Sequence, residues 1–208
     1  MVTVYFDFLC PYAWRGLELL AALEIEFDPV HYSLVQGNHP ENAGLLRSAP
    51  LWKLVDQPLL EGTDNLNQSL EAFLASHAAA KQGKALHERF ILQLFRAKHM
   101  DKQALSAEIT LEAATRAGLN LEQFKADRAE GKRCDARNFA LDLERAAGLG
   151  VFGTPTIQLE TGEAAYYRFA HLPETPEARL GAWNLFQTVL RDGATIETIK
   201  RPRAGSKA

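Results

Sequence analysis

The fold is decided near the start of the chain, in the stretch Phe6-Asp7-Phe8-Leu9-Cys10-Pro11-Tyr12-Ala13-Trp14. Residues 2–8 alternate regularly, and apolar side chains fall on both faces of the resulting strand, which is typical of a central strand. Pro11 suits the first turn of a helix, where its missing N–H is no loss. A helix pattern then runs over residues 12–25. The stretch therefore predicts that a central strand ends, and a helix begins, at Cys10.

The position of Cys10 has a chemical consequence. A helix N-terminus presents free N–H groups and about half a positive charge. Both favour a thiolate over a thiol, and the thiolate is the nucleophile in disulfide exchange. Cys10 is therefore the candidate catalytic residue, and Pro11, Tyr12 and Trp14 are candidates for the substrate-binding surface. The alternative is that Cys10 is a small buried hydrophobic residue.

A second signal lies far along the chain, at residues 153–156, Gly-Thr-Pro-Thr. A proline is anomalous in a run that otherwise reads as a central strand, because it cannot donate to the ladder. The residues alone leave two explanations open, a cis Thr154–Pro155 peptide or a trans proline in a turn. A cis peptide would leave a free backbone edge beside Cys10, where an extended peptide or glutathione could pair. Thr154 and Pro155 are therefore candidate substrate-binding residues.

The remaining elements complete the fold prediction. A second strand is expected at residues 29–35, helices over residues 65–149, a hairpin of residues 151–159 and 164–169, and a last helix from Thr175-Pro176. This order predicts an α/β, thioredoxin-like fold with a large helical insertion. The expected domain bounds are 1–63 and 149–199 for the thioredoxin-like domain, 64–148 for the inserted helical subdomain and 200–208 for a frayed basic tail.

Together these features resemble the DsbA-like branch of the thioredoxin superfamily. Four segments carry the resemblance: residues 6–14, the FrnE-like insertion motifs Leu94-Phe95-Arg96-Ala97 and Ala117-Gly118-Leu119, and the cis-proline segment at 150–156. In this family a cysteine at the position of Cys10 attacks or receives a disulfide. The cis-proline loop packs against that site and orients the substrate, so the resemblance favours a cis peptide at Pro155.

One departure from the family pattern concerns position 13. The usual motif is Cys-x-x-Cys, and here the second cysteine is replaced by Ala13. A mixed disulfide at Cys10 then has no neighbouring thiol to release it, so release would need an external thiol such as glutathione. Cys134 is the other cysteine of the chain. The sequence does not reveal whether it reaches Cys10.

The leading hypothesis is a cytoplasmic, DsbA-like thiol–disulfide oxidoreductase that forms a mixed disulfide between Cys10 and glutathione or a protein thiol. The close relatives on this fold are kappa-class glutathione transferases and 2-hydroxychromene-2-carboxylate isomerases, which typically have Ser-Pro-Tyr at residues 10–12. A glutathione-dependent transferase or isomerase is therefore the first alternative. Their Gly-x-Asp-Arg segment has no match at residues 169–173, which argues against transferring their glutathione site. The second alternative is a redox-inactive module that binds peptides.

Composition limits the classes of partner. The chain has 208 residues, is 47% hydrophobic and carries a formal net charge of −3. Such a chain has no broad basic field for nucleic acid, and it has no apolar run of the ~20 residues that a membrane helix needs. The expected partners are therefore protein thiols, protein disulfides or glutathione, with neither nucleic acid nor membrane. A homodimer is an open alternative for the assembly.

The six histidines show no spacing that is typical of a metal site. We therefore expect no metal and no tightly bound cofactor, with glutathione as a possible co-substrate only. His77 and His87 lie on helical patterns and are predicted to be solvated. His39 and His171 are the histidines that could approach Cys10 and stabilise its thiolate.

Overall fold

The computed structural model describes residues 1–37, 63–134 and 136–191, without the side chains of residue 36 and residues 131–140. Most of the segment between the expected strand at residues 29–35 and the expected helices from residue 65 lies outside the described residues. The predicted basic tail at residues 200–208 lies outside them as well. Within the described part, no helix combines the length and the apolar character that crossing a membrane requires.

A four-stranded sheet with strand order β2-β1-β3-β4 forms the centre of the fold. The strands are β1 (Val2–Phe6), β2 (Phe27–His31), β3 (Thr156–Gln158) and β4 (Ala164–Tyr166). β1 pairs in parallel with β2 and antiparallel with β3, and β3 pairs antiparallel with β4. β1 is thus a central strand, as the apolar content of both its faces predicts. Helix α1 (Pro11–Ala22) makes the crossover between the two parallel strands.

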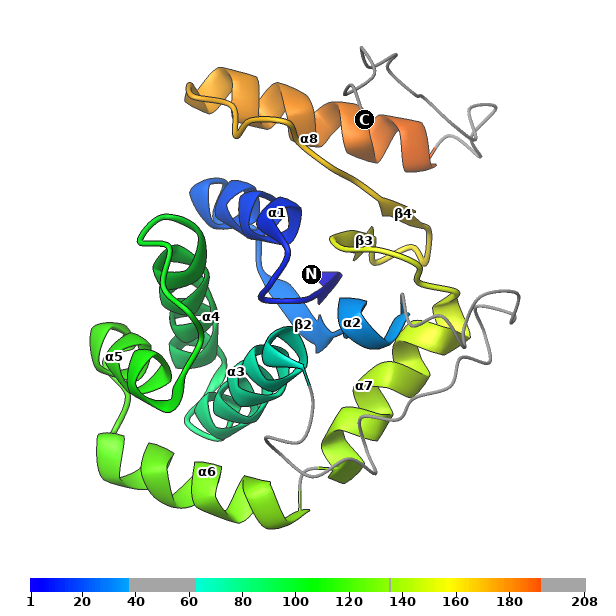
Figure 1. The fold of residues 1–208 in the computed structure, drawn as a ribbon. Coiled ribbons are helices and arrows are strands. Elements are labelled where there is room, and N and C mark those ends of the chain that lie inside the picture. Colours follow the sequence, from blue (N-terminus) through cyan, green and yellow to red (C-terminus); the bar gives the residue numbers. More distant parts are fainter. Residues whose placement is uncertain (38–62, 135, 192–208) are drawn as a thin grey trace, which may run out of the picture.

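Helices surround this sheet. The described residues form α2 (Leu34–Gly37), α3 (Asp64–Ala80), α4 (Lys84–His99), α5 (Ala107–Ala117), α6 (Leu121–Cys134), α7 (Ala136–Leu149) and α8 (Pro176–Arg191). Helices α3 to α6 pack on one another, α1 contacts α4 and α8, and α7 contacts β2. Figure 1 shows α1 and α8 on one side of the sheet and α7 on the other. The predicted helical block is thus divided between a bundle and a helix that covers the sheet. The domain bounds stay a prediction.

The alternation along β1 separates two apolar clusters. Val2, Val4 and Phe6 are buried in the larger cluster, which includes residues of α1, α3 and α4. Tyr5 points the other way, into a smaller cluster that includes Val30 of β2 and residues of α7. Because successive side chains of a strand point to opposite faces, this short segment holds helices against both sides of the sheet.

The second strand differs from the prediction of residues 29–35. β2 ends at His31, although the N–H of Tyr32 still donates to the carbonyl of Phe6 over 2.8 Å. The N–H of Leu34 donates instead to the carboxylate of Asp7, over 2.8 Å. The chain therefore leaves the sheet early, and α2 begins at Leu34, where the predicted strand would continue to residue 35.

Other element boundaries are also shorter than predicted. α1 ends at Ala22 rather than at residue 25, and Glu24 has a left-handed backbone with φ of 54°. β3 begins only after Pro155, which has no N–H to donate to a ladder. The start of α8 agrees with the prediction, since the hydroxyl of Thr175 accepts a hydrogen bond from the N–H of Ala178 over 3.2 Å.

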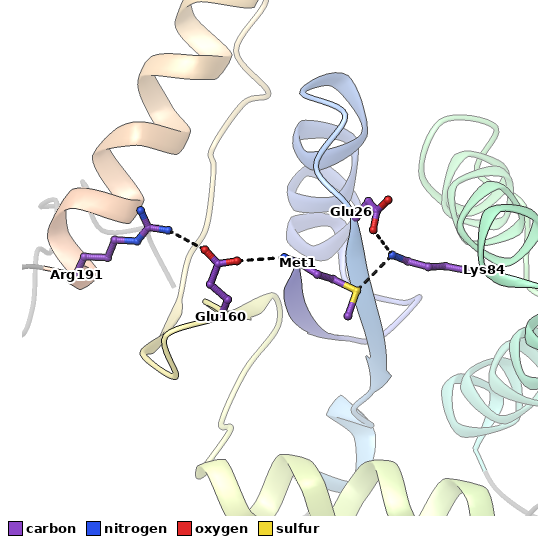
Figure 2. A network of polar contacts seen from close by, with 5 residues as sticks. All are labelled: Met1, Glu26, Lys84, Glu160 and Arg191. Carbon is purple, nitrogen blue, oxygen red and sulfur yellow. Dashed lines mark hydrogen bonds and ion pairs between the residues drawn. The ribbon is translucent and has the colours of Figure 1, made fainter.

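A chain of exposed polar contacts surrounds the start of β1 (Figure 2). The amino group of Met1 donates to Glu160 over 3.3 Å, and Arg191 of α8 contacts the same carboxylate over 3.5 Å. Lys84 of α4 donates to Glu26 over 2.7 Å and to the sulfur of Met1 over 3.3 Å. Exposed ion pairs contribute little to stability, so this network matters less than the apolar clusters beneath it.

Candidate active site

The thiol of Cys10 lies at the N-terminus of α1. Its backbone is extended, with φ of −90° and ψ of 113°, and the residue is the N-cap of the helix. The sulfur accepts a hydrogen bond from the N–H of Ala13 over 3.4 Å and donates its own proton to the carbonyl of Thr154 over 3.2 Å. The residue is buried, with 5% of its surface exposed. A thiolate at this position would keep the N–H donor and the positive end of the helix.

The partner of the thiol is a loop that arrives from the far end of the chain. Its Thr154–Pro155 peptide is cis, which is the form that the family resemblance favours. Two hydrogen bonds hold the loop, from the Thr156 hydroxyl to the Gly153 carbonyl over 2.8 Å and from the Tyr167 N–H to the Pro155 carbonyl over 3.1 Å. The structure therefore brings together three residues that the sequence nominated, Cys10, Thr154 and Pro155.

The close approach of this loop to α1 depends on a glycine. A Cβ atom added at Gly16 would lie 3.1 Å from Cγ of Pro155. That separation is shorter than ordinary van der Waals contact, so a side chain at residue 16 would press on the loop. Gly16 therefore permits the contact between the helix that carries Cys10 and the loop that carries Thr154.

Asp7 supports the turn between β1 and Cys10. Its carboxylate is fully buried and accepts hydrogen bonds from the Leu9 N–H over 2.9 Å, the Leu34 N–H over 2.8 Å and the Ser69 hydroxyl over 3.0 Å. Burial raises the pKa of Asp7, although these three hydrogen bonds oppose the effect. Asp7 is thus a hydrogen-bonded, buried carboxylate, and it ties the active-site turn to α2 and α3 as a positioning residue.

His99 is a site residue that sequence reasoning missed. Its Nε2 lies 2.9 Å from the carbonyl of Phe8, and because a carbonyl only accepts, this nitrogen carries the proton. Burial lowers the pKa of His99 to about 4, so the ring is neutral near pH 7. The ring stacks on Trp14, with 5.7 Å between centroids. Only the packing of α4 on α1 brings His99 to this place, and no local sequence signal reveals it.

Trp14 is held mainly by contacts to its own helix and to α4. Besides stacking on His99, its indole N–H donates to Glu18 over 3.1 Å. Arg96 of α4 donates two hydrogen bonds to the same carboxylate, over 2.7 and 2.8 Å. These contacts give Trp14 a packing role between α1 and α4, and its contact with substrate stays a prediction.

Tyr12 lies beside two arginines, Arg15 and Arg168, which form a cationic rim near the sulfur of Cys10. The guanidinium carbon of Arg168 is 3.9 Å from the centroid of the Tyr12 ring, and that of Arg15 is 5.5 Å away. Arg168 also donates to the hydroxyl of Tyr166 over 2.8 Å. This hydrogen bond is the main cause of the raised pKa of Arg168, and the nearby groups of Tyr12 and Cys10 raise that pKa further. Pro11 is exposed next to this rim. Arg168 was not nominated from the sequence, because only the sheet places the end of β4 beside α1.

The other nominated side chains have different outcomes. His171 is exposed, and its approach to Cys10 stays a prediction. His39 lies outside the described residues. Cys134 closes α6, and its side chain is not among those described, so a contact with Cys10 stays untested.

Comparisons with known proteins support this architecture. Residues 4–163 match a family model described as thioredoxin. The cytosolic disulfide reductase DsbM from Pseudomonas aeruginosa, solved with GSH, is 19% identical, with 89% of this chain and 98% of that chain covered and a TM-score of 0.56. DsbA from Mycobacterium tuberculosis in its oxidised form is 16% identical, with 88% of each chain covered and a TM-score of 0.51.

A third similar structure is the thiol–disulfide exchange protein α-DsbA2 from Wolbachia pipientis. It is 16% identical, with 88% of this chain and 80% of that chain covered and a TM-score of 0.50. No curated protein matches the sequence. At these identities the likeness concerns the fold, and it confirms the predicted thioredoxin-like fold with a helical insertion and the resemblance to DsbA-like proteins.

Gly16→Ala and Gly181→Ala form a matched pair, because each replaces the sixth residue of a helix. Alanine is more favourable than glycine in a helix by about 1 kcal/mol. At Gly181 an added Cβ meets no atom within 4 Å, so we expect the full gain. At Gly16 we expect the contact with Pro155 to cancel or reverse it. Urea unfolding measures both variants, and equal gains would contradict the close approach of loop and helix.

The lowered pKa of His99 predicts a pH effect on stability. The unfolded chain binds a proton below about pH 6.5, whereas the folded chain binds it only near pH 4, so the free energy of unfolding falls as pH falls between these values. His99→Gln keeps an N–H donor but does not titrate. We expect its stability to fall less steeply, by up to about 1.4 kcal/mol per pH unit. Urea unfolding from pH 7 to 4 tests this, with exposed His171→Gln as control; a slope equal to wild type would refute it.

Proposed function

Because the chain belongs to the thioredoxin family, whose model matches residues 4–163, we propose that it is a thiol–disulfide oxidoreductase that works through Cys10 alone. The observation that carries the proposal is the position of the Cys10 sulfur, between the N–H of Ala13 and the carbonyl of Thr154. Ala13 is fully buried and stands where the DsbA-like motif has its second cysteine. The motif Cys10-Pro11-Tyr12-Ala13 therefore supports a monothiol route.

The proposed reaction has two exchange steps. The Cys10 thiolate attacks one sulfur of a disulfide, a Cys10–sulfur bond forms, and the other sulfur leaves as a thiolate that takes up a proton. An external thiolate then attacks the mixed disulfide, and Cys10 leaves as the thiolate it was at the start. In each cycle one external thiol is oxidised, because it forms a new disulfide with the sulfur that Cys10 had retained. The other sulfur of the substrate is released reduced, and the reverse sequence is equally balanced. A reducing compartment, such as the cytoplasm expected from the sequence, would supply the external thiol.

Glutathione is the small thiol that the rim of the site favours. Each glutathione carries two carboxylates, and guanidinium groups pair with carboxylates through two parallel hydrogen bonds. Arg168 and Arg15 both lie against Tyr12, and the charge of Arg168 also interacts with that of Cys10. The similar structure of DsbM was solved with GSH, which is a property of that protein. The binding of glutathione by this chain is our proposal.

A protein substrate would also contact apolar surface beside the cis-proline loop. Phe152, directly before the cis-proline loop, is 48% exposed, and its ring meets that of Tyr166 at 5.3 Å between centroids. Thr154 is almost fully buried, and its hydroxyl has no hydrogen-bond partner among the described residues. An extended peptide laid along this loop would contact Phe152 and pair with backbone groups near Thr154.

Incubation with oxidised glutathione tests the central residue. We expect mass spectrometry to find one glutathione on the peptide that contains Cys10, stable until reduced glutathione is added. Cys134→Ser should keep this adduct and Cys10→Ser should lose it. Ala13→Cys should make it short-lived, because the new thiol would displace glutathione and form a disulfide with Cys10.

Two outcomes would reject the monothiol oxidoreductase. If no adduct forms at Cys10 and Cys10→Ser keeps full turnover of a glutathione-conjugation substrate, the protein is a transferase or isomerase of the kappa type. If Cys10 exchanges with no disulfide while the chain still binds peptides, the peptide-binding module is the better description.

Arg168→Gln tests the preference for a charged substrate. We expect formation of the mixed disulfide with oxidised glutathione to slow by about fivefold, since one exposed charge-assisted contact of about 1 kcal/mol is lost. The reaction with hydroxyethyl disulfide, which is uncharged, should keep its wild-type rate. Raised salt should reduce the difference between variant and wild type for glutathione only. Equal slowing of both disulfides would instead indicate that Arg168 acts on Cys10 itself.

A further inference from the structure

Two histidines and one aspartate meet at the junction of β2, α3 and α7. Nδ1 of His31 lies 2.6 Å from Oδ2 of Asp142, and Nε2 of His77 lies 3.5 Å from the same oxygen. Each of the three residues offers one possible metal-ligand atom, and these three atoms lie within 4.8 Å of one another. The residues are 46 and 65 positions apart in the chain, so no sequence spacing reveals the cluster, and only the packing of the three elements assembles it.

The cluster is largely shielded from water. His31 is 2% exposed and is covered by the rings of Phe6 and Phe73, whose centroids lie 5.2 and 4.9 Å away. The side chains of His77 and Asp142 are each 16% exposed, which leaves one side of the cluster accessible. The prediction that His77 is solvated is therefore wrong, because α3 turns that residue toward β2 and α7.

His87 extends the same interior group. It was also predicted to be solvated, but it is 8% exposed, and its Nε2 lies 2.7 Å from the hydroxyl of Ser76. Burial lowers its pKa to about 3, so the ring is neutral. Nε2 of His87 is engaged by the hydroxyl of Ser76. We therefore do not count His87 among the side chains that converge on Asp142.

We propose that His31, His77 and Asp142 form a binding site for a divalent transition metal ion, with Zn²⁺ as the best match. Two imidazole nitrogens and one carboxylate oxygen are a common ligand set for zinc sites that keep an open position. Magnesium and calcium prefer sites made of oxygen donors alone, which this cluster does not offer.

The two separations from Asp142 fit an ion of this size, and the ligand nitrogens of the two histidines lie within 4.8 Å of each other. In a tetrahedral zinc site with bonds of about 2.0–2.1 Å, neighbouring donor atoms lie about 3.4 Å apart. The separation between His77 and Asp142 already has that value, at 3.5 Å. The separation between His31 and Asp142, at 2.6 Å, would open by less than about 1 Å on binding. The same oxygen also accepts a hydrogen bond from the backbone N–H of His31 over 3.2 Å, and this bond would lengthen with the movement.

The charge of the cluster also suits a cation. Oδ2 of Asp142 faces one ring nitrogen each of His31 and His77, and it also accepts the hydrogen bond from the backbone N–H of His31. The carboxylate therefore brings one negative charge. On metal binding, the protons that the two histidines direct at Asp142 would move to their other ring nitrogens or leave to solvent.

Such an ion would link three elements that are distant in the chain. β2 is an edge strand, α3 belongs to the helical bundle, and α7 covers the sheet. His31 packs against Phe6 and Phe8, which belong to the segment that leads to Cys10. The ion would thus stabilise the framework behind the active site and take no part in disulfide exchange.

Zinc titration of the full chain tests the proposal. The background carries Cys10→Ser and Cys134→Ser, so that no thiol competes for the metal. We expect one Zn²⁺ per chain and a Tm that rises by about 5–10 °C when free Zn²⁺ is a hundredfold above Kd. Co²⁺ should give visible absorption bands without charge transfer from sulfur.

Variants of the cluster locate the ion. His77→Gln and Asp142→Asn should each weaken zinc binding at least tenfold, whereas the matched control His171→Gln, at an exposed position, should bind as the background does. If either cluster variant loses its far-UV circular dichroism, ¹⁵N shifts of the imidazole nitrogens in the background protein replace it: zinc should move the signals of His31 and His77. Absence of stoichiometric zinc binding, or unchanged affinity in both variants, would overturn the proposal and leave the cluster as a hydrogen-bonded support.

Discussion

The hydrogen bond from the thiol of Cys10 to the carbonyl of Thr154 joins residues that are 144 positions apart. It is the point at which the strand–helix junction at the start of the chain meets the cis-proline loop near its end. β1 lies between β2 and β3, so the sheet itself sets the distance between these two segments. Everything proposed for the chemistry depends on that meeting, because the helix end favours a thiolate while the loop offers a backbone edge to a substrate.

Several buried contacts keep this arrangement in place, and each uses a different physical effect. Gly16 leaves room for Pro155 against α1. Asp7 gathers two backbone N–H groups and one hydroxyl around a carboxylate that has lost its water, which links the turn before Cys10 to α2 and α3. His99 remains neutral and donates to the carbonyl of Phe8. The turn around Cys10 is therefore supported by neutral or fully hydrogen-bonded groups. Charged groups act in the Glu18–Arg96 ion pair beside Trp14 and at the exposed rim at Arg168.

The helical insertion contributes to the site as well as surrounding it. α4 supplies His99 and Arg96, and α3 supplies Ser69, so the bundle is in direct contact with the segment around Cys10. α7 contacts β2 instead and brings Asp142 toward His31. The larger apolar cluster thus borders two polar sites: the Cys10 thiol at the start of α1, and the His–Asp cluster at the junction of β2, α3 and α7.

The sequence by itself determined the local features. The alternation of residues 2–8, the junction at Cys10, the replacement of a second cysteine by Ala13 and the anomalous Pro155 are all readable from neighbours in the chain, since strand period, helix start and missing N–H are local properties. Only the tertiary structure decided which residues that are distant in the chain lie close together. Packing between elements decides where β2 ends, how His99 and Arg168 reach the active-site segment, and how His31 meets Asp142. The number of residues between two such positions does not predict their distance in space.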